Sequence, residues 1–229
     1  MPEKILRKLP DPQPMPMTVT DALRKRRTIR TISDRPLTEA ELANLLWAAA
    51  GVTSKDGKRT APTCLNLRSV SVFLLAKDGV WRYDGEKHAL ELVVREDLRA
   101  ASTLGQHAFV DNAPATLVFV AENTPRTQMA QPYFVYLDAG AMMENAAVAA
   151  AAMGLAGVPR GSVNGPELGK SMRLPATFRR SSATRSGTHS NPYRLAQKTI
   201  LLAPQAIGTP AFCAENNLQS PFERGSFHV

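Results

Sequence analysis

Residues 69–84 read "SVSVFLLAKDGVWRYD", and this stretch restricts the fold more than any other. Apolar and β-branched side chains on both sides of Lys77, Asp78 and Gly79 predict two strands joined by a tight hairpin. Strands joined in this way are antiparallel, whereas parallel neighbours need a long crossover connection. The stretch therefore excludes a doubly wound sheet in which every strand is parallel.

The rest of the chain alternates further strands with helices, which predicts an α+β fold with a mainly antiparallel central sheet flanked by helices. The expected strands cover 69–76, 80–84, 89–94, 115–122, 155–161 and 198–208, with one hairpin among them. The expected helices begin at Thr18 or Thr20, and then cover 38–51, 95–106, 133–153 and 164–174.

The helix expected at 38–51 has the clearest ends. Thr38 and Glu41 have the spacing of a capping box, in which the two side chains satisfy each other's backbone N–H groups. Leu42, Leu45 and further apolar residues share one face, and Gly51 is a common helix terminator.

The chain divides into three expected parts. Residues 1–17 form an extended N-terminal arm, because five prolines exclude a helix. Residues 18–210 form one domain, in which the Ser/Thr/Arg-rich stretch at about 176–193 is an irregular insertion that we expect to be mobile. Residues 211–229 form a C-terminal tail without hydrophobic periodicity.

Composition and charge allow several classes of function. The 229 residues carry a formal net charge of +8, which suits nucleic acid or an anionic cofactor. No apolar run has the roughly 18 residues needed to cross a membrane, and residues 1–20 lack the apolar core of a signal peptide. Cys64 and Cys213 lie in no CxxC pair. We expect a soluble cytoplasmic protein without a membrane partner.

Much of the charge is concentrated in "RKRRTIR", residues 24–30. Three interpretations are open: a solvated helix face, a nucleic-acid patch together with Arg179, Arg180 and Arg185, or a site for one small phosphate. No helix-turn-helix, zinc finger or aromatic RNA-binding strand accompanies the cluster, so we expect no nucleic-acid partner. Guanidinium groups bind phosphate through paired, charge-assisted hydrogen bonds, which favours the phosphate site.

Three motifs together resemble the FMN-dependent nitroreductase family, and in particular its short-chain branch. They are "ALRKRRTIRTISDRPLTEAELANLLWAAAGV" at 22–52, "DGKRTAPTCLN" at 56–66 and "YLDAGAMMENAAVAAAAMGLAGVPRGSV" at 136–163. The resemblance covers residues 18–174 and 195–210. It implies a nitroreductase-like α+β sandwich in which FMN is held by the cationic motif, with Arg26, Arg27, Thr28 and Arg30 at the phosphate.

The resemblance also implies contacts with the flavin ring. Asn66 is expected at the edge of the isoalloxazine, and Pro159, Arg160 and Gly161 are expected on its N5 side. Arg160 or Arg68 would stabilise the negative charge that develops on the ring when it is reduced.

The activity implied is the transfer of electrons from NADH or NADPH to nitroaromatic, quinone or similar small-molecule acceptors by a ping-pong mechanism. The flavin carries this chemistry, so no catalytic side chain is expected. Members of the family are homodimers with FMN bound between the subunits, and the same is implied here. The alternative is a non-catalytic basic protein of the same fold that binds nucleic acid or another anion.

Other polar residues predict no second chemistry. The four histidines lack metal-ligand spacing, so no metal site is expected. Asn145 stands in an Ala-rich helix, where we expect its amide to satisfy a buried backbone group.

Overall fold

The computed structural model describes residues 4–103, 107–111, 113–122, 124–128, 133–161, 163–174, 178 and 195–204. Its strands are β1 (Leu6–Lys8), β2 (Val70–Ala76), β3 (Gly79–Asp84), β4 (Ala89–Val94), β5 (Ala115–Ala121), β6 (Leu155–Arg160) and β7 (Leu195–Pro204). Its helices are α1 (Val19–Lys25), α2 (Glu39–Ala50), α3 (His107–Val110), α4 (Pro125–Gln128), α5 (Phe134–Ala152) and α6 (Gly165–Ser171). Two 3-10 turns are η1 (Cys64–Asn66) and η2 (Ala100–Ser102). The expected insertion at 176–193, except Phe178, and the tail at 211–229 lie outside the described residues.

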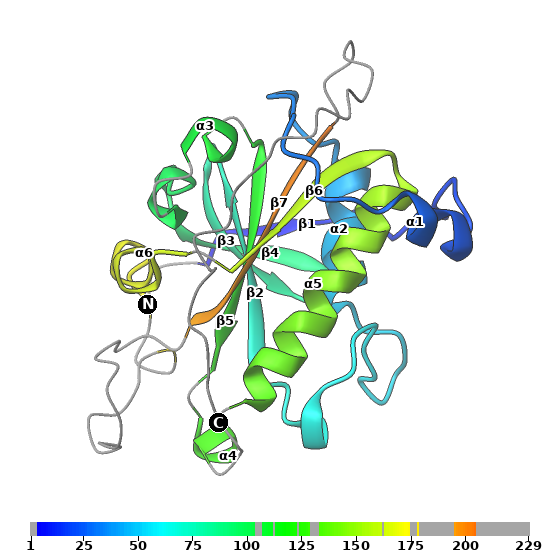
Figure 1. Ribbon diagram of the computed structural model, residues 1–229. Coiled ribbons are helices and arrows are strands. Elements are labelled where there is room, and N and C mark those ends of the chain that lie inside the picture. Colours follow the sequence, from blue (N-terminus) through cyan, green and yellow to red (C-terminus); the bar gives the residue numbers. More distant parts are fainter. Residues whose placement is uncertain are drawn as a thin grey trace, which may run out of the picture.

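One sheet of seven strands forms the centre of the molecule, in the order β1-β4-β3-β2-β5-β7-β6 (Figure 1). Every pair of neighbouring strands in this order is antiparallel. The α+β fold with an antiparallel sheet is thus confirmed. The sequence predicted one hairpin, but β2, β3 and β4 form two, because the turn at 85–88 joins β3 to β4 as directly as Lys77–Asp78 joins β2 to β3.

Both faces of the sheet are covered, so its central strands are buried on both sides. In β2, Val72 and Leu74 pack into the core with α2 and α5, whereas the alternate residues Phe73 and Leu75 pack into a second core with Leu168 of α6. This is the alternation that a strand imposes on successive side chains. Figure 1 shows α2 and α5 on one side of the sheet and α6 on the other.

The sequence predicted a helix over residues 95–106, and this prediction is wrong. Among the described residues of that stretch, only the three-residue turn η2 is helical. The Asp97 carboxylate accepts hydrogen bonds from the Arg99 backbone N–H at 3.1 Å and from the Arg99 guanidinium at 2.6 Å. Such local side-chain bonds compete with the helical backbone pattern and hold the chain in a turn.

The N-terminal arm joins the domain through backbone and side-chain hydrogen bonds. Strand β1 pairs with β4, and Leu9 is buried. The backbone N–H of Gln13 donates to Asn44 Oδ1 at 2.8 Å, and the Asn44 amide donates to the Gln13 carbonyl at 3.1 Å. This reciprocal pair fixes the arm to α2.

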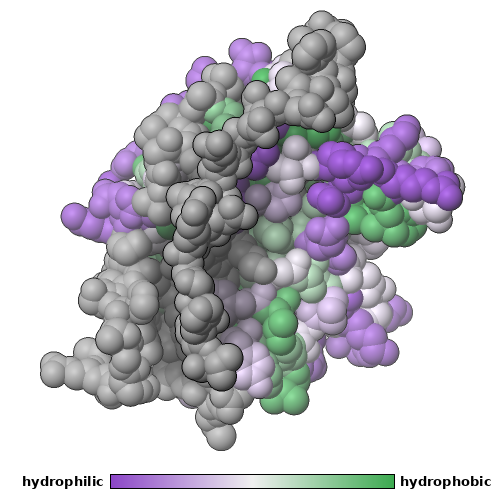
Figure 2. Space-filling model, viewed as in Figure 1, coloured by the Kyte–Doolittle hydropathy of each residue, from purple (hydrophilic) through white to green (hydrophobic). Residues whose placement is uncertain are grey.

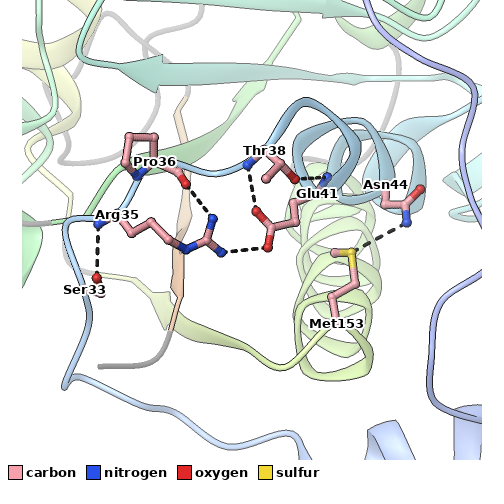
Figure 3. Close-up of polar contacts among 7 residues, drawn as sticks. All are labelled: Ser33, Arg35, Pro36, Thr38, Glu41, Asn44 and Met153. Carbon is pink, nitrogen blue, oxygen red and sulfur yellow. Dashed lines mark hydrogen bonds and ion pairs between the residues drawn. The ribbon is translucent and has the colours of Figure 1, made fainter. Parts of the chain in front are cut away.

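The capping box predicted for α2 is present (Figure 3). Glu41 N–H donates to Thr38 Oγ1 at 3.2 Å, and the Glu41 carboxylate accepts from Thr38 N–H at 2.7 Å. Arg35 donates to the same carboxylate at 2.8 Å. Burial opposes the ionised form of Glu41, but the hydrogen bonds from Arg35 and Thr38 outweigh it and lower the pKa of Glu41. The start of α2 is therefore fixed both by the cap and by an ion pair.

We expect Thr38→Ala to lower the free energy of unfolding by about 1 kcal/mol, because the N–H of Glu41 loses its acceptor. Urea denaturation measures this loss. Thr18→Ala is the matched control: Thr18 caps α1, a seven-residue helix in which only Ala22 is buried, so we expect a smaller effect. Equal losses in the two variants would contradict the importance assigned to the α2 cap.

Candidate functional site

The cationic segment leaves α1 and runs beside strand β6. Thr28 forms a parallel β-bridge with Gly157, and the backbone N–H of Ile29 donates to the Gly157 carbonyl at 3.2 Å. The segment therefore contacts the β6 edge of the sheet through a single bridge, and its partner Gly157 lies two positions before Pro159 and four before Gly161. Two of the three motifs thus meet through the backbone, although about 130 residues separate them in sequence.

The arginines of this segment differ in their partners. Arg26 is partly buried and its Nε lies 3.4 Å from a Glu144 carboxylate oxygen on α5. Arg27 donates to the Arg26 carbonyl at 2.7 Å. Arg27, Thr28 and Arg30 are exposed, and among the described residues neither Arg27 nor Arg30 has a carboxylate partner. Two guanidinium groups without a carboxylate partner in the described residues, together with a hydroxyl, lie on one short extended segment. This set of hydrogen-bond donors fits a phosphate.

A cavity of about 290 Å³ lies between this segment and the C-terminal half of α5. Lys25, Arg27 and Ile29 line one side. The other side of the cavity is lined by small residues of α5, of the turn that follows it and of β6, and these leave the space open: Ala147, Ala151, Gly154 and Gly157. The cavity places cations against an apolar wall.

Arg160 lies inside the protein and not on the exposed surface of this segment. Its side chain is 6% exposed, and Nη2 donates to the Ser102 hydroxyl of η2 at 2.9 Å. Burial lowers the pKa of the Arg160 guanidinium. The neighbouring Gly161 is exposed, and Pro159 is partly buried. The stabilisation of a reduced flavin by Arg160 stays a prediction.

The loop that contains Asn66 is held by a buried carboxylate that the sequence analysis did not single out. Asp138 of α5 is 3% exposed and accepts from the Thr63 hydroxyl at 2.8 Å, the Cys64 N–H at 2.8 Å and the Ser69 hydroxyl at 3.0 Å. A carboxylate with several donors fixes backbone that no regular element holds. Its signal in the sequence is an acidic residue in an otherwise apolar stretch, "FVYLDAGAMM".

Within this loop the backbone takes unusual dihedrals. Leu65, Asn66 and Arg68 have φ values of 51°, 52° and 53°, in the left-handed region that side chains rarely adopt. The conformation leaves Leu65 and Asn66 exposed. The Arg68 guanidinium donates to the Gly57 carbonyl at 2.9 Å and lies 3.8 Å from Glu86. Arg68 is thus directed toward the β3–β4 turn, and its contact with a flavin stays a prediction.

The two parts of the site contact helix α5 at different positions along its axis. The loop with Asn66 is bound to Asp138, whereas Arg26 reaches Glu144, six residues or about 9 Å further along the axis. Asn145 donates to the Thr60 carbonyl at 3.2 Å, which confirms the backbone role expected for its amide. Figure 1 shows α1 beside one half of α5 and the loop before β2 beside the other. The loop of Asn66 and the cationic segment therefore contact the same helix at two different positions.

The sequence and the fold match known proteins. A sequence model of the nitroreductase family matches residues 23–182, well over half of the chain. The chain belongs to the nitroreductase family. It is 27% identical over 165 residues to a candidate nitroreductase of Methanocaldococcus jannaschii, and the match covers 67% of this chain and 83% of that protein.

Solved structures of the same fold agree. A candidate nitroreductase from Ralstonia eutropha is 32% identical, with a TM-score of 0.73 over 88% of this chain and 90% of that one. A candidate nitroreductase from Desulfovibrio desulfuricans, solved in complex with FMN, is 21% identical, with a TM-score of 0.56 over 90% and 98% of the two chains. The nitroreductase-like sandwich expected from the sequence is confirmed, and membership of the family makes the protein an oxidoreductase.

Two further expectations concern metal and membrane. Within the described residues, no group of three or more histidine, cysteine or acidic side chains could hold a metal ion. In that same part of the chain, no helix is both long and apolar enough to cross a membrane. The cytoplasmic location stays a prediction.

We expect Asp138→Ala to lower the free energy of unfolding by roughly 3 kcal/mol, because the Thr63 hydroxyl, the Cys64 N–H and the Ser69 hydroxyl lose their acceptor. Denaturant unfolding monitored by tryptophan fluorescence measures the change.

Glu144→Ala on the same helix is the control for Asp138→Ala. The Glu144 side chain is 52% exposed and its pair with Arg26 is long, so we expect a loss below about 1 kcal/mol. If the Asp138 variant were as stable as the Glu144 variant, the loop would not depend on this carboxylate.

Proposed function

We propose that this protein is an FMN-dependent oxidoreductase that passes electrons from NADH or NADPH to a nitroaromatic, quinone or similar small-molecule acceptor by a ping-pong mechanism. The observation that carries the proposal is the bridge between Thr28 and Gly157. It joins an exposed cationic segment, in which Arg27 and Arg30 have no carboxylate partner among the described residues, to strand β6, which leads to Gly161. Membership of the nitroreductase family supports the same conclusion.

The residues of the cationic segment fit the phosphate of FMN. Arg27 and Arg30 are exposed without a carboxylate partner in the described part of the chain, and the Thr28 hydroxyl lies between them in sequence. Arg26 completes the set, since its ion pair with Glu144 is long and partly exposed. A phosphate monoester would replace water around these groups with charge-assisted hydrogen bonds.

When bound, FMN supplies the redox chemistry, and the chain contributes binding and orientation. Arg26, Arg27, Thr28 and Arg30 would hold the phosphate. Pro159 and Gly161 would limit one side of the ring. Asn66 is exposed on a loop that Asp138 fixes, and although its Oδ1 accepts a long hydrogen bond from Arg68 Nε at 3.4 Å, its amide NH2 would face the ring edge as a donor. None of these roles requires a nucleophile or a general base.

We also propose that the protein is a homodimer, and the exposed apolar side chains of α5 and the adjoining loop support this. Tyr133, Tyr136, Leu137 and Leu65 are between 45% and 74% exposed. Figure 2 shows a hydrophobic patch on the surface where Figure 1 places the N-terminal part of α5. Apolar patches of this kind mark interfaces between proteins.

We expect the purified protein to stay yellow after FMN is added and the unbound flavin is removed by desalting, and the Arg30→Ala variant to bind FMN more weakly. The loss of one charge-assisted contact is expected to weaken binding by about 1.5–3 kcal/mol, measured by quenching of FMN fluorescence. Arg24→Ala is the control, because it removes one exposed cation from helix α1, before the extended segment that carries Arg26, Thr28 and Arg30. Absence of FMN binding, together with salt-sensitive binding of DNA or RNA, would favour the anion-binding alternative.

For the dimer, we expect the mass from light scattering to be twice the 24.9 kDa of one chain. Leu137→Glu should shift it toward one chain, because a carboxylate cannot be buried unpaired in an apolar interface. Ile5→Glu, at an apolar residue of similar exposure before β1, should leave it unchanged. A wild-type protein with the mass of one chain at micromolar concentration would disprove the proposal.

A further inference from the structure

A second and larger cavity lies apart from the cationic segment, although Arg68, a residue expected near the flavin ring, contributes to its lining. It has a volume of about 400 Å³ and opens where the loop after α2 meets the turn between β3 and β4. It shares no lining residue with the cavity beside the cationic segment. Ala50, Leu67, Val70 and Val72 form the smaller, apolar part of a lining that is mostly polar. The nitroreductase reaction as proposed above leaves this cavity without a role.

Charged side chains line the rest of the cavity, and its acidic groups are all neutralised. Each of the four carboxylates in the lining forms an ion pair with an arginine or lysine. The pairs are Arg82–Glu122 at 3.2 Å, Arg68–Glu86 at 3.8 Å, Lys4–Glu91 at 2.6 Å and Lys87–Asp84 at 3.4 Å. The cavity therefore offers no acidic group that lacks a cation.

Arg59 is the exception among the charged lining residues. It is partly buried, and within the described residues its side chain forms neither an ion pair nor a hydrogen bond. Its Nε is buried without an acceptor. Burial, followed by the nearby positive charge of Arg68, lowers the pKa of the Arg59 guanidinium. A partly buried cation without a partner is unfavourable unless an anion joins it.

We propose that this cavity binds a small monocarboxylate, and that the Arg59 guanidinium holds the carboxylate. A planar carboxylate matches the two parallel N–H groups of a guanidinium. Arg59 supplies one positive charge without a partner, so we expect the ligand to carry one negative charge. A second negative charge on the ligand would be repelled by the neighbouring carboxylates. This site does not depend on the proposed flavin chemistry.

Benzoate is a suitable probe, and benzamide has the same shape without the charge. Calorimetric titration of the full chain loaded with FMN should show benzoate binding at least tenfold more tightly than benzamide. Arg59→Met should remove this difference. Phthalate, with two carboxylates, should bind no more tightly than benzoate.

Arg173→Met is the matched control, because it also removes one positive charge, from a side chain that is 73% exposed outside the cavity. It should leave benzoate binding unchanged. Arg59→Met should unfold at a temperature no lower than the wild type, since it removes a charge without a partner. Arg59→Lys keeps the charge but not the paired N–H groups, and should weaken benzoate at least threefold.

Two results would overturn the proposal. One is equal affinity of benzoate for the wild type and for Arg59→Met. The other is benzoate binding that changes the flavin absorbance and does not respond to substitution of Arg59, because the probe would then sit on the flavin. Loss of FMN binding in Arg30→Ala with intact benzoate binding would leave this proposal standing, so the two proposals fail separately.

Discussion

The burial of α5 against the sheet is the constraint on which the rest of the structure depends. The helix packs against α2 and the inner strands, and most of its length is apolar. Its few polar groups must therefore reach partners in other segments, because a buried polar group without a partner is costly. Asp138 binds the loop before β2 and Asn145 donates to Thr60, while the exposed Glu144 on the same helix pairs with Arg26. Segments that lack regular structure of their own are placed by this one helix.

The arrangement of charge separates structural cations from those available to ligands. Arg35 and Arg82 have carboxylate partners and help to hold loops and strands. Arg30 at the edge of the sheet and Arg59 in the larger cavity have none within the described residues. The paired N–H groups of a guanidinium at such a position suit a small anion such as a phosphate or a carboxylate.

Local patterns predicted most elements because local forces decide them. The alternation in β2, the capping box of Thr38 and Glu41, and the apolar run of α5 each carry their own signal. The prediction failed at 95–106, where helical propensity was outweighed by the bonds between Asp97 and Arg99. The cationic motif was visible in the sequence, but nothing in residues 24–30 indicated that Thr28 would pair with Gly157.

The sequence by itself determined the class of fold, the ends of α2, and the identity of the cationic cluster and of the family. These follow from the hydrophobic period, from capping chemistry and from the order of residues in short motifs, all of which act within a few positions. Only the tertiary structure decided which cations keep a partner, that Arg160 is buried while Arg30 is exposed, and that Asp138 fixes the loop of Asn66. Burial and pairing depend on segments distant in sequence, so they are properties of the packed chain.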